Sequence, residues 1–202
     1  MLQVADGLGW QRFTLLGHSM GGGIASLLAA AAPERVEALI AIEALGALAE
    51  PVENTATRLR DAVASARTLA ERPLRVFPSM EMPVRARMMA NQLTEPAARL
   101  LVERGVRVVE GGYSWCSDPR LTLPTAIRMT EAQIDVLLAS IACPAQAIFA
   151  TPAQPYFPEA LRDHRVAMMR DARLQLLPGT HHVHMEMPEA VAAVIDDFLD
   201  HN

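Results

Sequence analysis

Apolar runs of strand length alternate with helical patterns near both ends of the chain. The runs cover residues 13–16, 36–42, 145–150 and 174–177, and the helical patterns cover residues 24–32, 158–170 and 188–200. In the last helix, Val191, Val194, Ile195, Phe198 and Leu199 follow the i, i+3, i+4, i+7, i+8 spacing of one buried face. Strands that alternate with helices in this way predict an α/β fold with a parallel sheet.

The middle of the chain has a different pattern. Arg- and Glu-rich amphipathic stretches separated by prolines predict several short helices there, and the one strand-length β-branched run is residues 106–109. We therefore expect three segments: a first part of the core at residues 1–46, a helical insertion at residues 47–140 and a second part of the core at residues 141–202.

The first strand stops abruptly in the sequence Gly-His-Ser-Met-Gly at residues 17–21 and runs at once into a helix. This strand, turn and helix context gives the G-x-S-x-G spacing a chemical meaning, because a strained turn leaves the Ser19 hydroxyl projecting above the strand end. We expect a positive φ at Ser19 and no room for side chains at Gly17 and Gly21. The helix start makes the Met20 N–H a natural donor to an oxyanion. The alternative is a glycine-rich turn without chemistry.

At these residues the chain resembles the α/β-hydrolase family, whose nucleophile turn is commonly written GHSMGG, and the whole chain resembles its serine hydrolase-like branch. The resemblance implies an α/β-hydrolase fold: a partial parallel sheet with flanking helices and an inserted helical cap. His18 and side chains of the cap would then contact substrate, or the cap residues merely pack its helices together. The cap candidates are Met80, Met82, Met88, Met89, Tyr113 and Trp115.

The resemblance also implies a catalytic histidine in the loop after the last strand, here residues 178–188. The family pattern assigns the role to His181, with His182 as the alternative, so His181 should lie within hydrogen-bond reach of Ser19. Three histidines with Glu186 could instead suggest a metal site. The loop matches the hydrolase pattern and no second ligand cluster stands elsewhere in the sequence, so we expect no metal.

The third catalytic residue is expected to be Glu43. The loop at residues 151–156, where the family usually carries this acid, has no carboxylate. Some members, haloalkane dehalogenases among them, carry it after the strand that follows the nucleophile helix, which is the place of Glu43. A carboxylate at the end of a buried strand needs a partner, which is either an arginine of the cap or the second ring nitrogen of His181. Ser19, where a dehalogenase or epoxide hydrolase needs Asp, argues against both activities.

These residues predict a serine hydrolase, esterase-like, acting on a small and largely apolar carbonyl compound; ester, thioester, amide and carbon–carbon bonds all stay open. The alternative is an incomplete or non-catalytic chain that binds a ligand or partner. It arises because the family's opening strands, and the loop with the second oxyanion donor, have no counterpart here. Residues 13–16 should then form an open sheet edge, through which self-association is possible.

Composition and charge further limit the classes of function that the chain could have. The net charge is -5 and all 18 basic residues are arginine, so there is no lysine nucleophile and no basic footprint for nucleic acid. Cys116 and Cys143 lie outside C-x-x-C spacing, which supports neither a zinc nor a redox motif. The longest apolar run is too short to cross a bilayer. We expect a cytoplasmic protein with a small-molecule substrate, no cofactor and no membrane partner.

Overall fold

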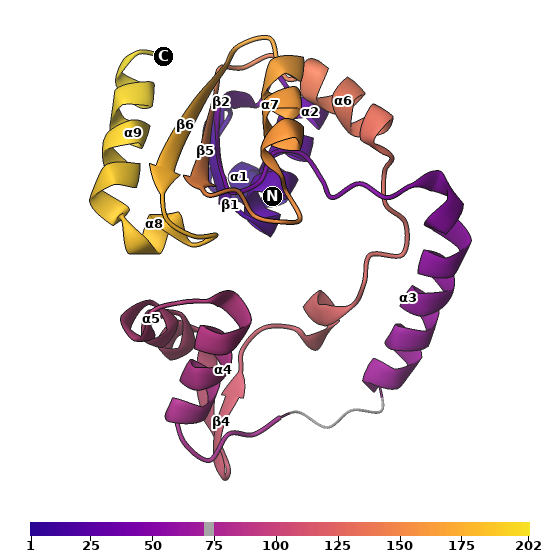
Figure 1. Cartoon of the computed structure of the whole chain (residues 1–202), viewed down its shortest axis with the longest axis vertical. Coiled ribbons are helices and arrows are strands. Elements are labelled where there is room, and N and C mark those ends of the chain that lie inside the picture. The colour runs from indigo at the N-terminus through magenta and orange to yellow at the C-terminus, as the bar shows by residue number, and fades with distance from the viewer. Residues whose placement is uncertain (71–74) are drawn as a thin grey trace. The chain divides into compact units, whose positions relative to one another are not determined.

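The structure, a computed structural model, describes residues 1–70 and 75–202 and divides into two compact units (Figure 1). The first unit comprises Met1–Glu50 and Met129–Asn202, and the second comprises Pro51–Arg128. The expected insertion of residues 47–140 reaches beyond the second unit at both ends. At its end, helix α6 (Glu131–Ala139) buries Ile134 and Leu138 in the core of the first unit.

Four parallel strands form the sheet of the first unit, in the order β1, β2, β5, β6. They are β1 (Phe13–His18), β2 (Val36–Ile42), β5 (Ala145–Thr151) and β6 (Ala172–Pro178). All three ladders are parallel, and the register pairs His18 with Ile42 and Ile42 with Ile148. The predicted α/β fold with a parallel sheet is confirmed, and the carboxyl ends of the strands meet at one edge.

Helices cover the two faces of this sheet (Figure 1). On one face, α2 (Met20–Ala31), α6 and α7 (Glu159–Met168) pack with strand residues such as Leu39. On the other, α8 (Val183–Glu186) and α9 (Pro188–Asp200) pack with residues such as Ile40. Neighbouring residues of a strand therefore enter opposite cores, which explains why β2 is apolar apart from Glu37 and β5 is apolar apart from Gln146 and Thr151. A short helix, α1 (Leu2–Gly7), precedes β1.

Strand β1 lies at an edge of the sheet. Within residues 1–70 and 75–202 it pairs on one side only, with β2. Its Leu16 side chain is 54% exposed, so the apolar pattern of the strand is incompletely covered. The expected open edge at residues 13–16 is confirmed, and self-association through it stays a prediction.

The second unit is mainly helical, as expected, and also contains a β-hairpin. Its helices are α3 (Thr55–Ala70), α4 (Glu81–Asn91) and α5 (Glu95–Gly105), with short 3-10 turns η1 (Val52–Asn54) and η2 (Pro119–Thr122). The hairpin pairs β3 (Val106–Val109) with β4 (Gly112–Trp115), and Phe77 bridges to Tyr113. None of the helices in the described ranges is both long and apolar enough to cross a membrane.

Arg165 is a buried charge that joins three segments of the first unit. This α7 side chain is 1% exposed. Its Nε and Nη2 atoms donate to the Glu131 carboxylate of α6 at 2.7 and 3.0 Å. Its Nη1 atom donates to the carbonyl oxygens of Leu45 and Ala47 at 2.6 and 2.9 Å. The segment after β2 is thereby held against α6 and α7.

Replacing Arg165 with leucine should lower the free energy of unfolding by about 3 kcal/mol, because Glu131 and two carbonyl groups lose their donor. Chemical denaturation measures this change. The matched control is Arg170→Leu, at an exposed position of the same region, which should stay within about 0.5 kcal/mol of the unmodified chain. Equal stabilities for the two variants would contradict the role of Arg165.

Candidate active site

The turn between β1 and α2 presents Ser19 in a strained conformation. Its φ of 55° and ψ of -122° match the predicted positive φ. A Cβ atom at Gly17 would lie 2.3 Å from the carbonyl oxygen of Gly21, so only glycine fits there. The same expectation for Gly21 is wrong, because a Cβ atom there would meet nothing within 4 Å. Gly22 is tight instead, because a Cβ atom there would lie 3.0 Å from the carbonyl oxygen of Gly17.

The three predicted catalytic side chains lie in one hydrogen-bonded row. Ser19 Oγ is 2.8 Å from His181 Nε2, and His181 Nδ1 is 3.2 Å from Glu43 Oε2. His181, rather than the alternative His182, therefore makes the expected contact with Ser19. A ring nitrogen between a hydroxyl and a carboxylate is the arrangement by which a base removes a proton from a nucleophile.

Glu43 is held tightly at the end of β2. The residue is 4% exposed, and its backbone has a positive φ of 56°. The Oε1 atom accepts a hydrogen bond from the Ala150 N–H, while Oε2 faces His181. Of the two partners expected for this carboxylate, the structure shows the second ring nitrogen of His181. The Ala150 N–H is a further donor that the sequence did not indicate.

Met20 opens helix α2, so its backbone N–H has no acceptor within the helix. The N–H follows Ser19 directly, which suits the predicted role as oxyanion donor. That role stays a prediction.

His18 packs against the histidine loop. Its Nε2 atom is 2.7 Å from the carbonyl oxygen of His181, and its ring centroid is 4.0 Å from that of His184. Burial lowers the pKa of His18 from 6.5 to about 4, and burial likewise lowers the pKa of His184. His18 is therefore neutral near pH 7. Its expected contact with substrate stays a prediction.

Tyr113 and Trp115 lie on β4 in the second unit. The ring centroids of Trp115 and Phe77 are 5.9 Å apart in an edge-on arrangement. The Arg87 guanidinium lies 4.9 Å from the centroid of the Trp115 ring. Tyr113 exchanges two backbone hydrogen bonds of 2.8 Å with Phe77. Both residues thus take part in the packing of their own unit, and their expected contact with substrate stays a prediction.

Tyr156 is a residue of the site that the sequence did not reveal. Its hydroxyl lies 2.7 Å from His181 Nδ1, the same nitrogen that faces Glu43. Burial, together with the charge of Glu43, raises the pKa of Tyr156 to about 12, so the hydroxyl keeps its proton near pH 7. The signal that could have indicated Tyr156 is its place in the loop where the related acid usually stands.

Comparison with known proteins identifies the family. Residues 2–194 match the model of the alpha/beta hydrolase family. The chain belongs to this family. It is 30% identical to a serine hydrolase-like protein of Danio rerio, over 98% of this chain and 63% of the relative. It is 28% identical to a serine hydrolase-like protein of Dictyostelium discoideum, over 98% of this chain and 58% of that relative. The chain therefore spans about three fifths of the length of these curated relatives.

Solved structures agree with this assignment to the alpha/beta hydrolases. A hypothetical protein from Pseudomonas aeruginosa PAO1 superposes with a TM-score of 0.89 at 35% identity, covering 98% of this chain and 71% of that one. The thioesterase domain from the curacin biosynthetic pathway gives a TM-score of 0.70 at 23% identity, and the match covers 96% of this chain and 69% of that domain. The second likeness concerns the fold alone. The predicted resemblance to the serine hydrolase-like branch is confirmed.

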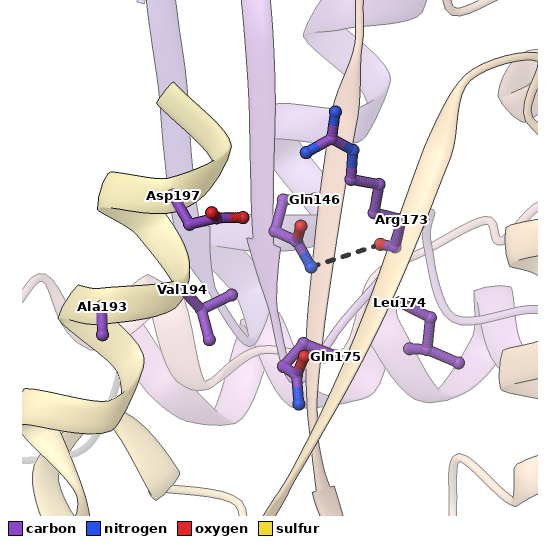
Figure 2. Close-up of a pocket in the computed structure, with 7 residues that line it drawn as sticks. All are labelled: Gln146, Arg173, Leu174, Gln175, Ala193, Val194 and Asp197. Carbon is purple, nitrogen blue, oxygen red and sulfur yellow. Dashed lines mark hydrogen bonds between the residues drawn. The ribbon is translucent and has the colours of Figure 1, made fainter. Parts of the chain in front are cut away.

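A pocket of about 460 Å³ lies elsewhere on this alpha/beta hydrolase, between the sheet and α9 (Figure 2). Its lining consists of Gln146, Arg173, Leu174, Gln175, Ala193, Val194 and Asp197. Gln146 and Arg173 stand near the amino ends of β5 and β6, whereas Ser19 and Glu43 follow carboxyl ends. Open α/β sheets bind their ligands at the carboxyl ends, so this pocket does not belong to the candidate site.

Tyr156→Phe should slow the reaction of Ser19 with a fluorophosphonate roughly fivefold, because His181 loses one hydrogen bond and keeps Glu43. The second-order labelling rate measures this effect without a known substrate. Thermal melting of the variant controls for the fold. An unchanged labelling rate would show that the Tyr156 hydroxyl does not assist His181.

Proposed function

We propose that this chain is a serine hydrolase, esterase-like, that cleaves a small and largely apolar carbonyl compound with Ser19, His181 and Glu43. The observation that carries the proposal is the row of contacts from Ser19 Oγ through both ring nitrogens of His181 to Glu43, at 2.8 and 3.2 Å. Membership of the alpha/beta hydrolase family supports it.

In the proposed mechanism, Ser19 Oγ attacks the carbonyl carbon while His181 Nε2 takes its proton. Glu43 accepts the hydrogen bond from Nδ1 and stabilises the positive charge that forms on the ring. The Met20 N–H, at the positive end of α2, stabilises the negative oxygen of the tetrahedral intermediate. His181 then protonates the leaving group as its bond to the carbonyl carbon breaks, which leaves the acyl group on Ser19 Oγ. Water attacks this acyl-enzyme with His181 again acting as the base, and His181 returns the proton to Ser19 Oγ as the acyl–oxygen bond breaks and the acid product leaves.

The substrate class is proposed from the side chains of the second unit. The names of the two curated relatives specify no substrate, and the likeness to a thioesterase domain at 23% identity concerns the fold alone. The apolar character of the substrate is proposed from the methionines of residues 80–89 and from Tyr113 and Trp115 as the lining of a cap. A screen of ester, thioester and amide substrates identifies the carbonyl bond that is cleaved.

The alternative, a chain that only binds a ligand or partner, accounts less well for the site. Such a chain could keep the glycine turn for packing. It would have no need of a buried carboxylate, 4% exposed, that faces the histidine beside Ser19. A buried carboxylate is costly to maintain, so its pairing with His181 favours catalysis.

A fluorophosphonate probe should label the chain on Ser19 alone, because the probe reacts with hydroxyls that a neighbouring base activates. Mass spectrometry of the labelled peptide identifies the site. Ser19→Ala should abolish labelling, while Ser140→Ala, at an exposed position that ends α6, should leave it intact. No labelling of the unmodified chain, with the fold intact, would favour the binding-only alternative.

Glu43→Gln should reduce kcat for a short-chain aryl ester about 10³- to 10⁴-fold, because a neutral amide cannot stabilise the imidazolium. Steady-state kinetics gives this value. The matched control, Glu189→Gln in the exposed first turn of α9, should hydrolyse the ester at the original rate. A full rate for Glu43→Gln would remove Glu43 from the mechanism.

A further inference from the structure

Three histidine rings gather beside the proposed catalytic row without taking part in it. His18 ends β1, whereas His182 and His184 come from the loop after β6 and the start of α8. One ring nitrogen of each lies within 4.8 Å of the others. The ring centroid of His18 is 5.1 Å from that of His182 and 4.0 Å from that of His184.

The hydrogen bonding of His18 and His184 leaves a lone pair on each ring for a ligand. Because His18 Nε2 lies 2.7 Å from the carbonyl oxygen of His181, Nε2 is the nitrogen that donates and Nδ1 keeps its lone pair. Histidines that bind metals commonly donate their other N–H to a backbone carbonyl in this way. His184 Nδ1 is buried and has no hydrogen-bond partner within residues 1–70 and 75–202. A buried polar atom of this kind calls for a partner from outside the chain.

We propose that His18, His182 and His184 bind one divalent transition-metal ion, with Zn²⁺ the best match. Three imidazoles and one open position form a ligand set that Zn²⁺ uses in proteins. Bonds of about 2.0–2.1 Å in a tetrahedral site bring nitrogen atoms to about 3.4 Å from one another. The nitrogens must therefore converge by at most about 1.4 Å, which requires the partly exposed His18 and His184 rings to rotate.

The proposed site uses other ligands than the metal site that the sequence analysis weighed and set aside. That alternative used the three histidines of the loop with Glu186. In the structure, the Glu186 carboxylate accepts hydrogen bonds from the N–H and the hydroxyl of Thr180, at 2.8 and 2.7 Å. His181 faces Ser19 instead. In the proposed site His18, which comes from the opposite end of the sequence, binds the ion with His182 and His184.

The bound ion would tie two segments together. His18 directly precedes Ser19, and His182 directly follows His181. A metal ion shared by His18, His182 and His184 therefore fastens the loop that carries His181 to the end of the strand that carries Ser19. Binding to the folded state alone would also stabilise the fold by mass action.

The test uses the purified chain after removal of metals with a chelator. Isothermal titration with Zn²⁺ should show one ion per chain and a rise in the melting temperature, and Co²⁺ should give the visible absorption of a tetrahedral nitrogen site. His184→Ala and His184→Gln should each weaken Zn²⁺ binding at least about tenfold, since even the loss of an outer partner of a ligand has this effect. The matched control, His201→Ala at the exposed end of α9, should bind Zn²⁺ as the original chain does.

His181→Ala separates this proposal from the proposed function. It should retain Zn²⁺ binding while it loses labelling by the fluorophosphonate probe. Loss of Zn²⁺ in His181→Ala with binding kept in both His184 variants would place the ion on the catalytic row and overturn the proposal. So would loss in His201→Ala, or no stoichiometric binding to the original chain. Circular dichroism of the metal-free variants confirms that each is folded.

Discussion

Backbone hydrogen bonds that continue the parallel sheet past its strand ends position the proposed catalytic residues. The Ser19 N–H donates to the Ile42 carbonyl at 2.9 Å, and the Glu43 N–H donates to that of Ile148 at 2.9 Å. The Gly179 N–H, ahead of the histidine loop, reaches the Thr151 carbonyl at 3.3 Å. Since parallel strands bring their carboxyl ends to one edge, three residues that are distant in sequence meet there. A slip of β2 by one residue would turn Glu43 to the opposite face and leave His181 without its carboxylate.

The same ladder maintains two strained residues. Ser19 and Glu43 both have a positive φ without being glycine, which costs about 1–3 kcal/mol each. The burial of Glu43 adds a desolvation cost, which the Ala150 N–H and the His181 ring offset. Tyr156 approaches the same ring nitrogen and so limits the orientations open to His181. Strain and buried charge are concentrated where the proposed chemistry needs a fixed geometry.

The parts of this arrangement that could be predicted were those that local patterns determine. Mainly apolar runs indicated β2 and β5, because both faces of those strands are buried. At the sheet edges, β1 and β6 extend past residues 13–16 and 174–177. The absent carboxylate of residues 151–156 indicated Glu43. The prediction that Gly21 has no room for a side chain was wrong, because the close backbone contact of the turn lies between Gly17 and Gly22. The site contacts of Tyr156 and the histidine cluster depend on contacts between distant segments, which periodicity does not encode, whereas β3 coincides with the β-branched run at residues 106–109.

Neighbouring histidines of one loop acquire different environments because Val183 anchors the loop. Val183 is fully buried in the core beneath α9, so the residues around it turn at the start of α8. His181 reaches Ser19, whereas His182 and His184 gather around His18. The His18 ring lies 4.8 Å from that of His181, which gains a positive charge in the proposed reaction. Because burial keeps His18 neutral, its ring adds no positive charge that would oppose the one on His181. The position of Val183 therefore decides which histidine of the loop faces Ser19 and which histidines face His18.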